Sequence, residues 1–256
     1  MPKWKRENGC YSCHNNGDGL RALIAAQRAG FEVDAKVIEE SLAALQPPGG
    51  DWEAKPLARL QRAVAVREAV AAGLLDRQTL EDSAALVARD QQSDGHWQVE
   101  DELAAVGSPV TYGPVLATYL ACEVLKASGT VELHASAIRR ARRWLTARKP
   151  AHVLDLAVLV LALGREPDRQ KLVAAQLPNA SWNNEPFDTA MARLALGASH
   201  PASKRARAFL IGTQWSGGGW PATTRPAGGD SYAQHISTTA WALISLSPSA
   251  AATERR

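Results

Sequence analysis

A linker of one design recurs along this chain: a Gln that ends one helix, a turn containing Gly or Asn, and a Trp that precedes the next helix. The two best copies are residues 91–97 (Gln-Gln-Ser-Asp-Gly-His-Trp) and 214–220 (Gln-Trp-Ser-Gly-Gly-Gly-Trp). Less complete copies occupy residues 46–52 and 176–182. Self-similarity at this period indicates a repeat architecture built from paired helices.

The segments between these linkers have helical periodicity. Ala, Leu and Val recur at i, i+3 and i+4, while the alternation typical of a strand is scarce. Clusters of Gly, Pro, Asn and Asp end the segments, because they cannot continue a helix. The pattern therefore predicts an all-α fold. The predicted helices cover residues 19–29, 35–45, 57–72, 80–89, 112–126, 131–147, 153–163, 169–176, 187–196, 202–212 and 236–246.

Counting the second helix of each pair gives six units. Their starts lie near Asp18, Pro56, Tyr112, His152, Phe187 and His235. Six inner helices can close a ring, in which the first and the sixth are neighbours. We therefore expect a single domain over residues 1–250 and a disordered tail at 251–256. The linker Trp side chains are expected to be buried, and the Gln side chains to bond helix ends or neighbouring backbone groups.

The Gln-x-x-x-Gly-x-Trp linkers resemble the QW repeats of the squalene-hopene cyclase and protein prenyltransferase superfamily. The resemblance covers roughly residues 30–246. It implies a single (α/α)6 toroid, an inner ring of six helices within an outer ring, with ligand chemistry at one mouth or in the central cavity. Cyclases of this superfamily normally carry two such barrels, and this chain has the length of one.

The sharpest chemical feature is the Cys-x-x-Cys-His motif formed by Cys10, Cys13 and His14. Two thiols this close in sequence can add to both vinyl groups of one porphyrin, and a His directly after the second Cys can ligate its iron. Only three Cys occur in the chain, and two of them lie here. The motif predicts haem c, with Cys10 and Cys13 as thioether attachments and His14 as the proximal ligand.

The position of the motif suggests a sixth iron ligand. Residues 10–18 fall where a linker is expected, directly before the first inner helix, so haem would lie at one mouth of the barrel. In a closed ring the sixth inner helix adjoins the first. His235, at the start of that sixth helix, is therefore the preferred sixth ligand, and His96 and His152 in equivalent linkers are the alternatives.

Other readings of the same residues stay open. Cys10, Cys13 and His14 could bind zinc together with His96 or His235, or the two thiols could form a redox pair. The resemblance also implies an enzyme acting on an isoprenoid in the barrel cavity, possibly with zinc, or an inactive toroid scaffold.

A cyclase of this superfamily carries its acid in an Asp-x-Asp-Asp-Thr-Ala motif. Here Asp188, Thr189 and Ala190 match, but Phe187 takes the place of the proton donor. Asp188 is therefore only a weak catalytic candidate, and is more readily explained as a first-turn helix residue.

Charge and hydropathy limit the partners. The chain has 29 Lys and Arg against 26 Asp and Glu, and this net charge of +3 is too small to indicate nucleic-acid binding. Residues 153–163 have the length of a buried helix, and no segment has the apolar length of a membrane span. The expected partners are a redox protein or a small-molecule or isoprenoid ligand.

Location depends on haem. Attachment through this motif takes place on the outer side of a bacterial membrane, which implies a periplasmic or exported protein, whereas without haem the chain would be cytoplasmic. Residues 1–6 lack the apolar stretch of a secretory signal. Two expectations follow: either Met1 is not the natural start and an export segment precedes it, or the motif does not receive haem.

Overall fold

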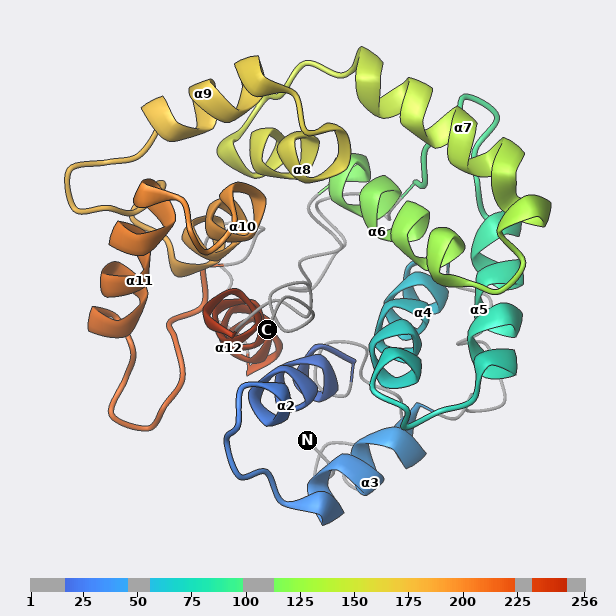
Figure 1. Cartoon of the computed structure of the whole chain (residues 1–256), viewed down its shortest axis with the longest axis horizontal. Coiled ribbons are helices and arrows are strands. Elements are labelled where there is room, and N and C mark those ends of the chain that lie inside the picture. Colours follow the sequence, from blue (N-terminus) through green and yellow to red (C-terminus); the bar gives the residue numbers. More distant parts are fainter. Residues whose placement is uncertain (1–16, 46–55, 99–112, 224–231, 248–256) are drawn as a thin grey trace.

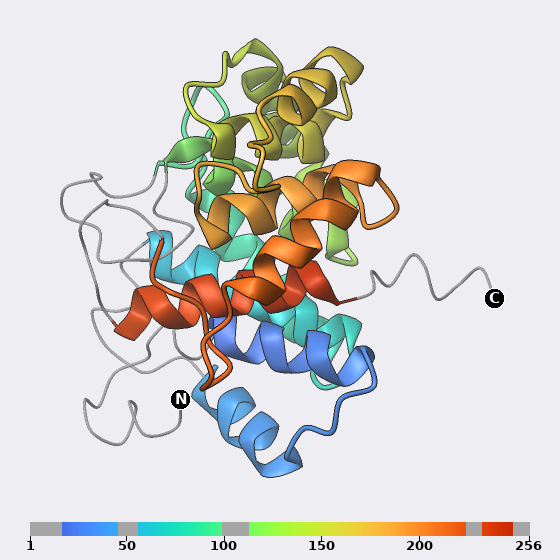
Figure 2. The same cartoon turned by 90° about the vertical axis from the view of Figure 1, so that its left-hand side faces the viewer.

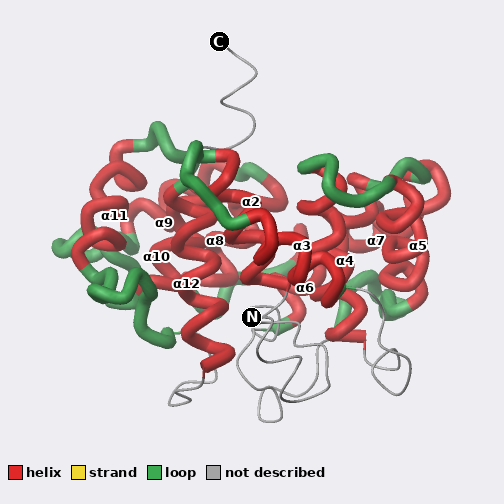
Figure 3. The backbone as a smooth tube through the Cα atoms, turned by 90° about the horizontal axis from the view of Figure 1, so that it is seen from below, coloured by secondary structure: helices red, strands yellow, loops and turns green. Residues whose placement is uncertain are grey.

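The computed structural model describes residues 17–45, 56–98, 113–223 and 232–247. Within these residues the chain forms eleven helices and no strand (Figure 3). The predicted all-α class is confirmed. The helices are α2 (Gly19–Arg28), α3 (Ala35–Ala44), α4 (Pro56–Ala71), α5 (Arg77–Arg89), α6 (Pro114–Ala127), α7 (Val131–Ala147), α8 (Val153–Leu163), α9 (Glu166–Ala174), α10 (Pro186–Leu196), α11 (Pro201–Gly212) and α12 (Tyr232–Leu246).

The predicted bounds agree closely with these helices. The largest difference is at α12, which begins at Tyr232 rather than at residue 236, so His235 lies inside its first turn. The Cys-x-x-Cys-His motif, the linker at 46–52 and the tail at 251–256 lie outside the described residues. None of the described helices combines the length and the apolar content needed to cross a bilayer.

Even-numbered and odd-numbered helices occupy different places in the molecule. In Figure 1 the odd-numbered helices lie outside the even-numbered ones. Each even-numbered helix packs on the next, from α2 through α4, α6, α8 and α10 to α12. Helix α12 also packs on α2, and Figure 2 shows the two side by side. The predicted contact between the helices at residues 19–29 and 236–246 is therefore confirmed.

The sequence accounts for the two helix classes. Helix α8 is apolar on most of its circumference and is buried between its neighbours, as its Leu- and Val-rich sequence requires. Helix α7 is amphipathic: Ala137, Ala141, Trp144 and Leu145 are buried while its Arg side chains lie outside. Side-chain caps fix the starts of outer helices, for example Asp76, which accepts a 2.7 Å bond from the Thr79 amide.

The linker Trp residues join successive helices in the same way in all three described copies. Each is almost completely buried, at 0–2% exposure. Each indole N–H donates to a carbonyl of the preceding helix, and each Trp amide donates to a Thr hydroxyl of the following helix. The first set of bonds is Trp97 to Val87, Trp182 to Leu172 and Trp220 to Leu210, at 2.7–2.8 Å. The second is Trp97 to Thr118, Trp182 to Thr189 and Trp220 to Thr239, at 3.0–3.1 Å.

The linker Gln residues each bond within their own turn, and two of them also reach the next outer helix. Gln91 donates to the Ala137 carbonyl of α7 at 2.8 Å, and Gln176 donates to the Ala202 carbonyl of α11 at 2.9 Å. An Arg three residues further along each of these helices donates back to the Gln carbonyl oxygen. The predicted burial of Trp and the predicted backbone bonding of Gln are confirmed.

The fifth position of the linker requires a left-handed backbone. Gly95 and Gly218 have φ values of 106° and 87°, and Ala180 stands at the same position with φ 68°. An L side chain in this backbone conformation costs about 1–2 kcal/mol relative to glycine. Glycine loses more conformational entropy on folding, which costs about 0.5–1 kcal/mol, so the two effects partly cancel. We expect Ala180→Gly to raise the free energy of unfolding by about 0.5–1 kcal/mol, measured by chemical denaturation.

Gly218→Ala is the matched control for that prediction. No atom lies within 4 Å of a Cβ added at Gly218, so only backbone strain changes. It should destabilise the protein by about 1 kcal/mol. A neutral or destabilising Ala180→Gly would contradict the assigned conformation.

Candidate functional site

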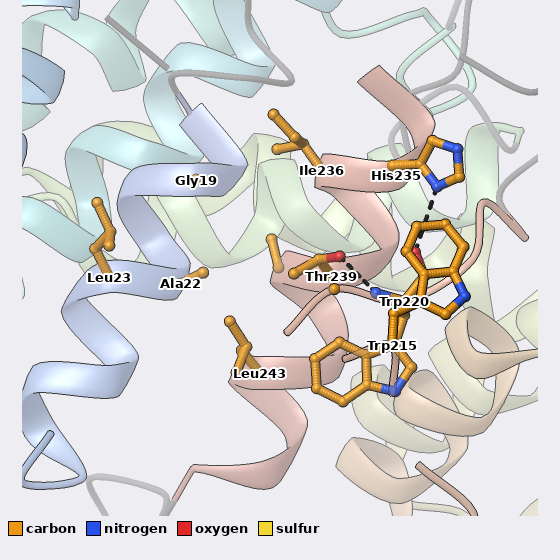
Figure 4. Close-up of a pocket in the computed structure, with 11 residues that line it drawn as sticks. Gly19, Ala22, Leu23, Trp215, Trp220, His235, Ile236, Thr239 and Leu243 are labelled. Atoms are coloured by element: carbon orange, nitrogen blue, oxygen red, sulfur yellow. Dashed lines mark hydrogen bonds between the residues drawn. The ribbon is translucent and has the colours of Figure 1, made fainter. Parts of the chain in front are cut away.

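An apolar groove lies between α2 and α12, where the first described helix meets the last (Figure 4). Its volume is about 260 Å³. Small residues at Gly19, Ala22 and Ala240 leave room between the helices, and larger apolar side chains complete the lining. The complete lining is Gly19, Ala22, Leu23, Trp215, Gly219, Trp220, His235, Ile236, Thr239, Ala240 and Leu243.

His235 stands at the end of the groove where α2 and α12 begin. Its Nδ1 lies 3.4 Å from the Trp220 carbonyl oxygen, and its ring lies 5.0 Å from that of Trp215. Nδ1 of His235 donates to this carbonyl in one of the two neutral tautomers of the ring. Trp220 is itself held by its linker bonds, so the carbonyl that orients His235 is fixed.

A buried polar cluster lies beside the groove and joins the same two helices. Asp18 accepts a 3.0 Å bond from Arg21 and a 2.9 Å bond from the Ser237 hydroxyl. The Arg21 guanidinium also stacks over the Trp241 ring, 4.4 Å from its centroid. All four side chains are at most 6% exposed. Burial raises the pKa of Asp18, while Arg21 and Ser237 act in the opposite direction.

This cluster was not predicted from the sequence. In the sequence, Asp18 marks the start of the first unit, and Arg21 lies within the first predicted helix. The Asp18–Ser237 bond matters because it fixes the point at which the preceding segment joins α2. Only four residue steps separate His14 from Asp18, which limits the distance between their Cα atoms to about 14 Å.

The structure separates the three candidate histidines. His235 lies in the groove beside α2. His96 lies in the linker before α6, where Asp94 and Gln98 bond its two ring nitrogens at 2.5 and 3.0 Å and Trp144 stacks on it at 5.2 Å. His152 is the exposed residue that precedes α8. Cys10, Cys13 and His14 lie outside the described residues.

No group of three or more His, Cys, Asp or Glu side chains suited to a metal occurs within the described ranges. Cys122 is buried, and burial raises the pKa of its thiol to about 11. A thiol with that pKa is neutral near pH 7 and is a poor metal ligand or nucleophile.

Asp188 lies in the first turn of α10 and is buried. Asn183 donates to one of its carboxylate oxygens at 2.6 Å. The neighbouring Phe187, which occupies the acid position of the cyclase motif, packs edge-on against Trp241 with a centroid distance of 6.2 Å. Asp188 therefore has the helix-start position expected for it.

Comparison with known proteins adds no identification: no family model and no curated protein matches this chain.

Proposed function

We propose that this chain is a single (α/α)6 toroid that carries haem c at the mouth where α2 and α12 begin, and that it serves in electron transfer or in binding small ligands at the iron. The order of helix packing supports the toroid, because the even-numbered helices follow one another and α12 returns to α2. The placement of the odd-numbered helices outside them agrees with an outer ring (Figure 1).

The observation that carries the haem proposal is the Asp18–Ser237 hydrogen bond, 2.9 Å long. It holds the end of the Cys-x-x-Cys-His segment against the helix that bears His235, two residues before Ser237. Because at most about 14 Å separates the Cα atoms of His14 and Asp18, both proposed iron ligands would belong to one end of the molecule. This agrees with the ring-closure argument that selected His235.

The groove would take up only one edge of the porphyrin. The lining of the groove is apolar. The groove volume, about 260 Å³, is smaller than that of sites that enclose a whole ligand of drug size. Cys10 and Cys13 would hold the group covalently, and His14 and His235 would bind the iron. Once bound, haem supplies one-electron redox chemistry or an exchangeable coordination position. We accordingly propose an exported location, where such attachment takes place.

An absorption spectrum tests the proposal directly. The protein should be produced with an export signal and haem-maturation machinery, and the ferric form should show the spectrum of low-spin c-type haem. His235→Ala should convert it to a high-spin form that binds cyanide or imidazole more readily. His96→Ala and His152→Ala are the controls and should leave the spectrum unchanged. Stoichiometric zinc without covalent porphyrin would overturn the proposal in favour of a zinc site.

The cyclase alternative makes a separate prediction. Because Phe187 replaces the proton donor and is packed against Trp241, we expect no measurable cyclisation of squalene or a related polyprene. The measurement is product analysis after incubation with purified protein. A cyclised product that disappears in Asp188→Asn would instead establish the enzyme.

A further inference from the structure

The exposed face of α7 carries a row of basic side chains. Arg139, Arg142 and Arg143 are exposed and lie at i, i+3 and i+4, so they share one side of the helix. Arg148 and Lys149, directly after the last helical residue, are also exposed and extend the row. We call these five residues the basic stripe. In Figure 1, α7 lies at the outer edge of the molecule, away from α2 and α12.

The basic stripe has no counter-charge within the described residues. Elsewhere Arg side chains meet carboxylates, as Arg59 meets Asp90 at 2.6 Å. No described carboxylate lies within ion-pairing distance of the charged nitrogens of the stripe. Glu132, the one acidic residue of α7, stands in its first turn, before the stripe begins. An excess of positive charge therefore remains on this face.

The basic stripe lowers the stability of α7 rather than adding to it. Like charges three or four positions apart repel one another on a helix surface, and Arg139 has such neighbours in Arg142 and Arg143. The helix dipole favours cations in the last turn, but the last turn of α7 contains no basic residue, so the dipole accounts at most for Arg148 at the C-cap. Since neither the helix nor a salt bridge explains the stripe, an anionic partner outside the chain does.

One end of the stripe is held in place before any partner binds. The Arg148 guanidinium lies 4.1 Å from the centroid of the Trp144 ring. Trp144 is itself buried, and the His96 ring stacks on it with a centroid distance of 5.2 Å. A cation that already rests on an aromatic ring loses less conformational freedom on binding. Arg148 therefore offers a preorganised guanidinium next to those of the helix.

We propose that the basic stripe docks an acidic helix of a partner protein, one whose Asp or Glu side chains recur at i, i+3 and i+4. Such a helix presents its carboxylates at the same spacing as Arg139, Arg142 and Arg143, about 5–6 Å between neighbours. Four of the five stripe residues are Arg, whose planar guanidinium binds a carboxylate through two parallel bonds. The inference goes beyond the haem proposal and does not depend on it.

A lipid surface and a nucleic acid fit the stripe less well. A basic helix that binds a bilayer places its apolar face among the lipids, but the apolar face of α7, with Ala141, Trp144 and Leu145, is buried inside the protein. Nucleic-acid binding is favoured by a large positive field, whereas the whole chain has a net charge of +3. A stripe confined to one helix of a nearly neutral chain is complementary to an acidic patch of similar size.

A model acidic helix tests the docking. The probe is a fluorescently labelled, alanine-based peptide helix with Glu at i, i+3, i+4 and i+7, and its affinity for the full chain is measured by fluorescence anisotropy at low salt. The double variant Arg139→Gln with Arg142→Gln should weaken binding at least about fivefold, because each exposed ion pair contributes up to about that factor. Binding should also weaken at about 0.15 M salt, where the Debye length is about 8 Å.

Lys204→Gln with Arg207→Gln is the matched control. These two exposed residues of α11 lie two and five positions after the carbonyl residue that Gln176 bonds, as Arg139 and Arg142 lie after the one that Gln91 bonds. The net charge changes equally in both double variants, but the control should leave the affinity nearly unchanged. Chemical denaturation should show that the α7 double variant is at least as stable as the wild type, because like-charge repulsion is removed.

Several results would overturn the docking. Absence of binding, or equal binding of a peptide with Gln in place of Glu, would exclude an acidic helix as the partner. An equal loss of affinity in the α11 control would show attraction by net charge alone. Tighter binding to phosphatidylserine vesicles or to a DNA duplex would assign the stripe to that surface instead. A less stable α7 double variant would give the stripe a structural role. None of these results bears on haem, whose attachment is measured by the spectrum.

Discussion

Replacing Trp182 by alanine should lower the free energy of unfolding by about 3–5 kcal/mol, the range observed when a large aromatic side chain is removed from a core. Trp182 is fully buried, and it bonds both the preceding helix, at Leu172, and the following one, at Thr189. The substitution creates a cavity and leaves the Leu172 carbonyl without its indole donor. Chemical denaturation followed by circular dichroism measures the loss.

Phe31→Ala is the control for this prediction. Phe31 is 69% exposed, so its removal should change stability by no more than about 0.5 kcal/mol. An effect of Trp182→Ala as small as that of Phe31→Ala would show that the linker Trp residues do not hold the repeat units together.

The double variant Cys10→Ser with Cys13→Ser should lose all covalently attached haem, whereas each single variant should weaken its retention. Each thioether bond to the porphyrin uses one of the two thiols, and ligation of the iron by histidine alone does not survive denaturation and acid extraction. The measurement is the haem that remains with the protein after that treatment. The helical fold should be largely intact, because the motif precedes α2 and all the described core.

Cys122→Ala is the control for the cysteine variants. This buried thiol, with its pKa raised to about 11, has no part in attachment, so haem retention should not change. Retention that persists in the double variant would contradict the thioether assignment. Loss of haem retention in Cys122→Ala would show that Cys122 takes part in attachment.

Local sequence signals predicted the helices well. Apolar periodicity and turn residues act over a few positions, and the bounds of α7 and α8 were predicted without error. The start of α12 was placed late because Tyr232 and its neighbours carry little apolar periodicity. The burial of the linker Trp side chains and the backbone bonding of the linker Gln side chains were also predictable, because the same residue pattern recurs in each copy.

The candidate site was only partly predictable. The sequence selected His235 through the order of the units, and α12 does pack on α2. It did not indicate that Nδ1 of His235 faces the Trp220 carbonyl, or that Arg21 stacks on Trp241. A weak signal existed in the small residues Gly19 and Ala22, which recur on one face of α2.

The sequence by itself determined the all-α class, the paired helices and the linker design, because periodicity, capping and turn chemistry depend on neighbours along the chain. Only the tertiary structure decided how α2 and α12 meet: the apolar groove and the buried Asp18–Ser237 bond across 219 positions. Those features depend on which side chains distant segments present to one another. Such pairing is set by packing and by the need to satisfy buried polar groups, and no local pattern encodes it.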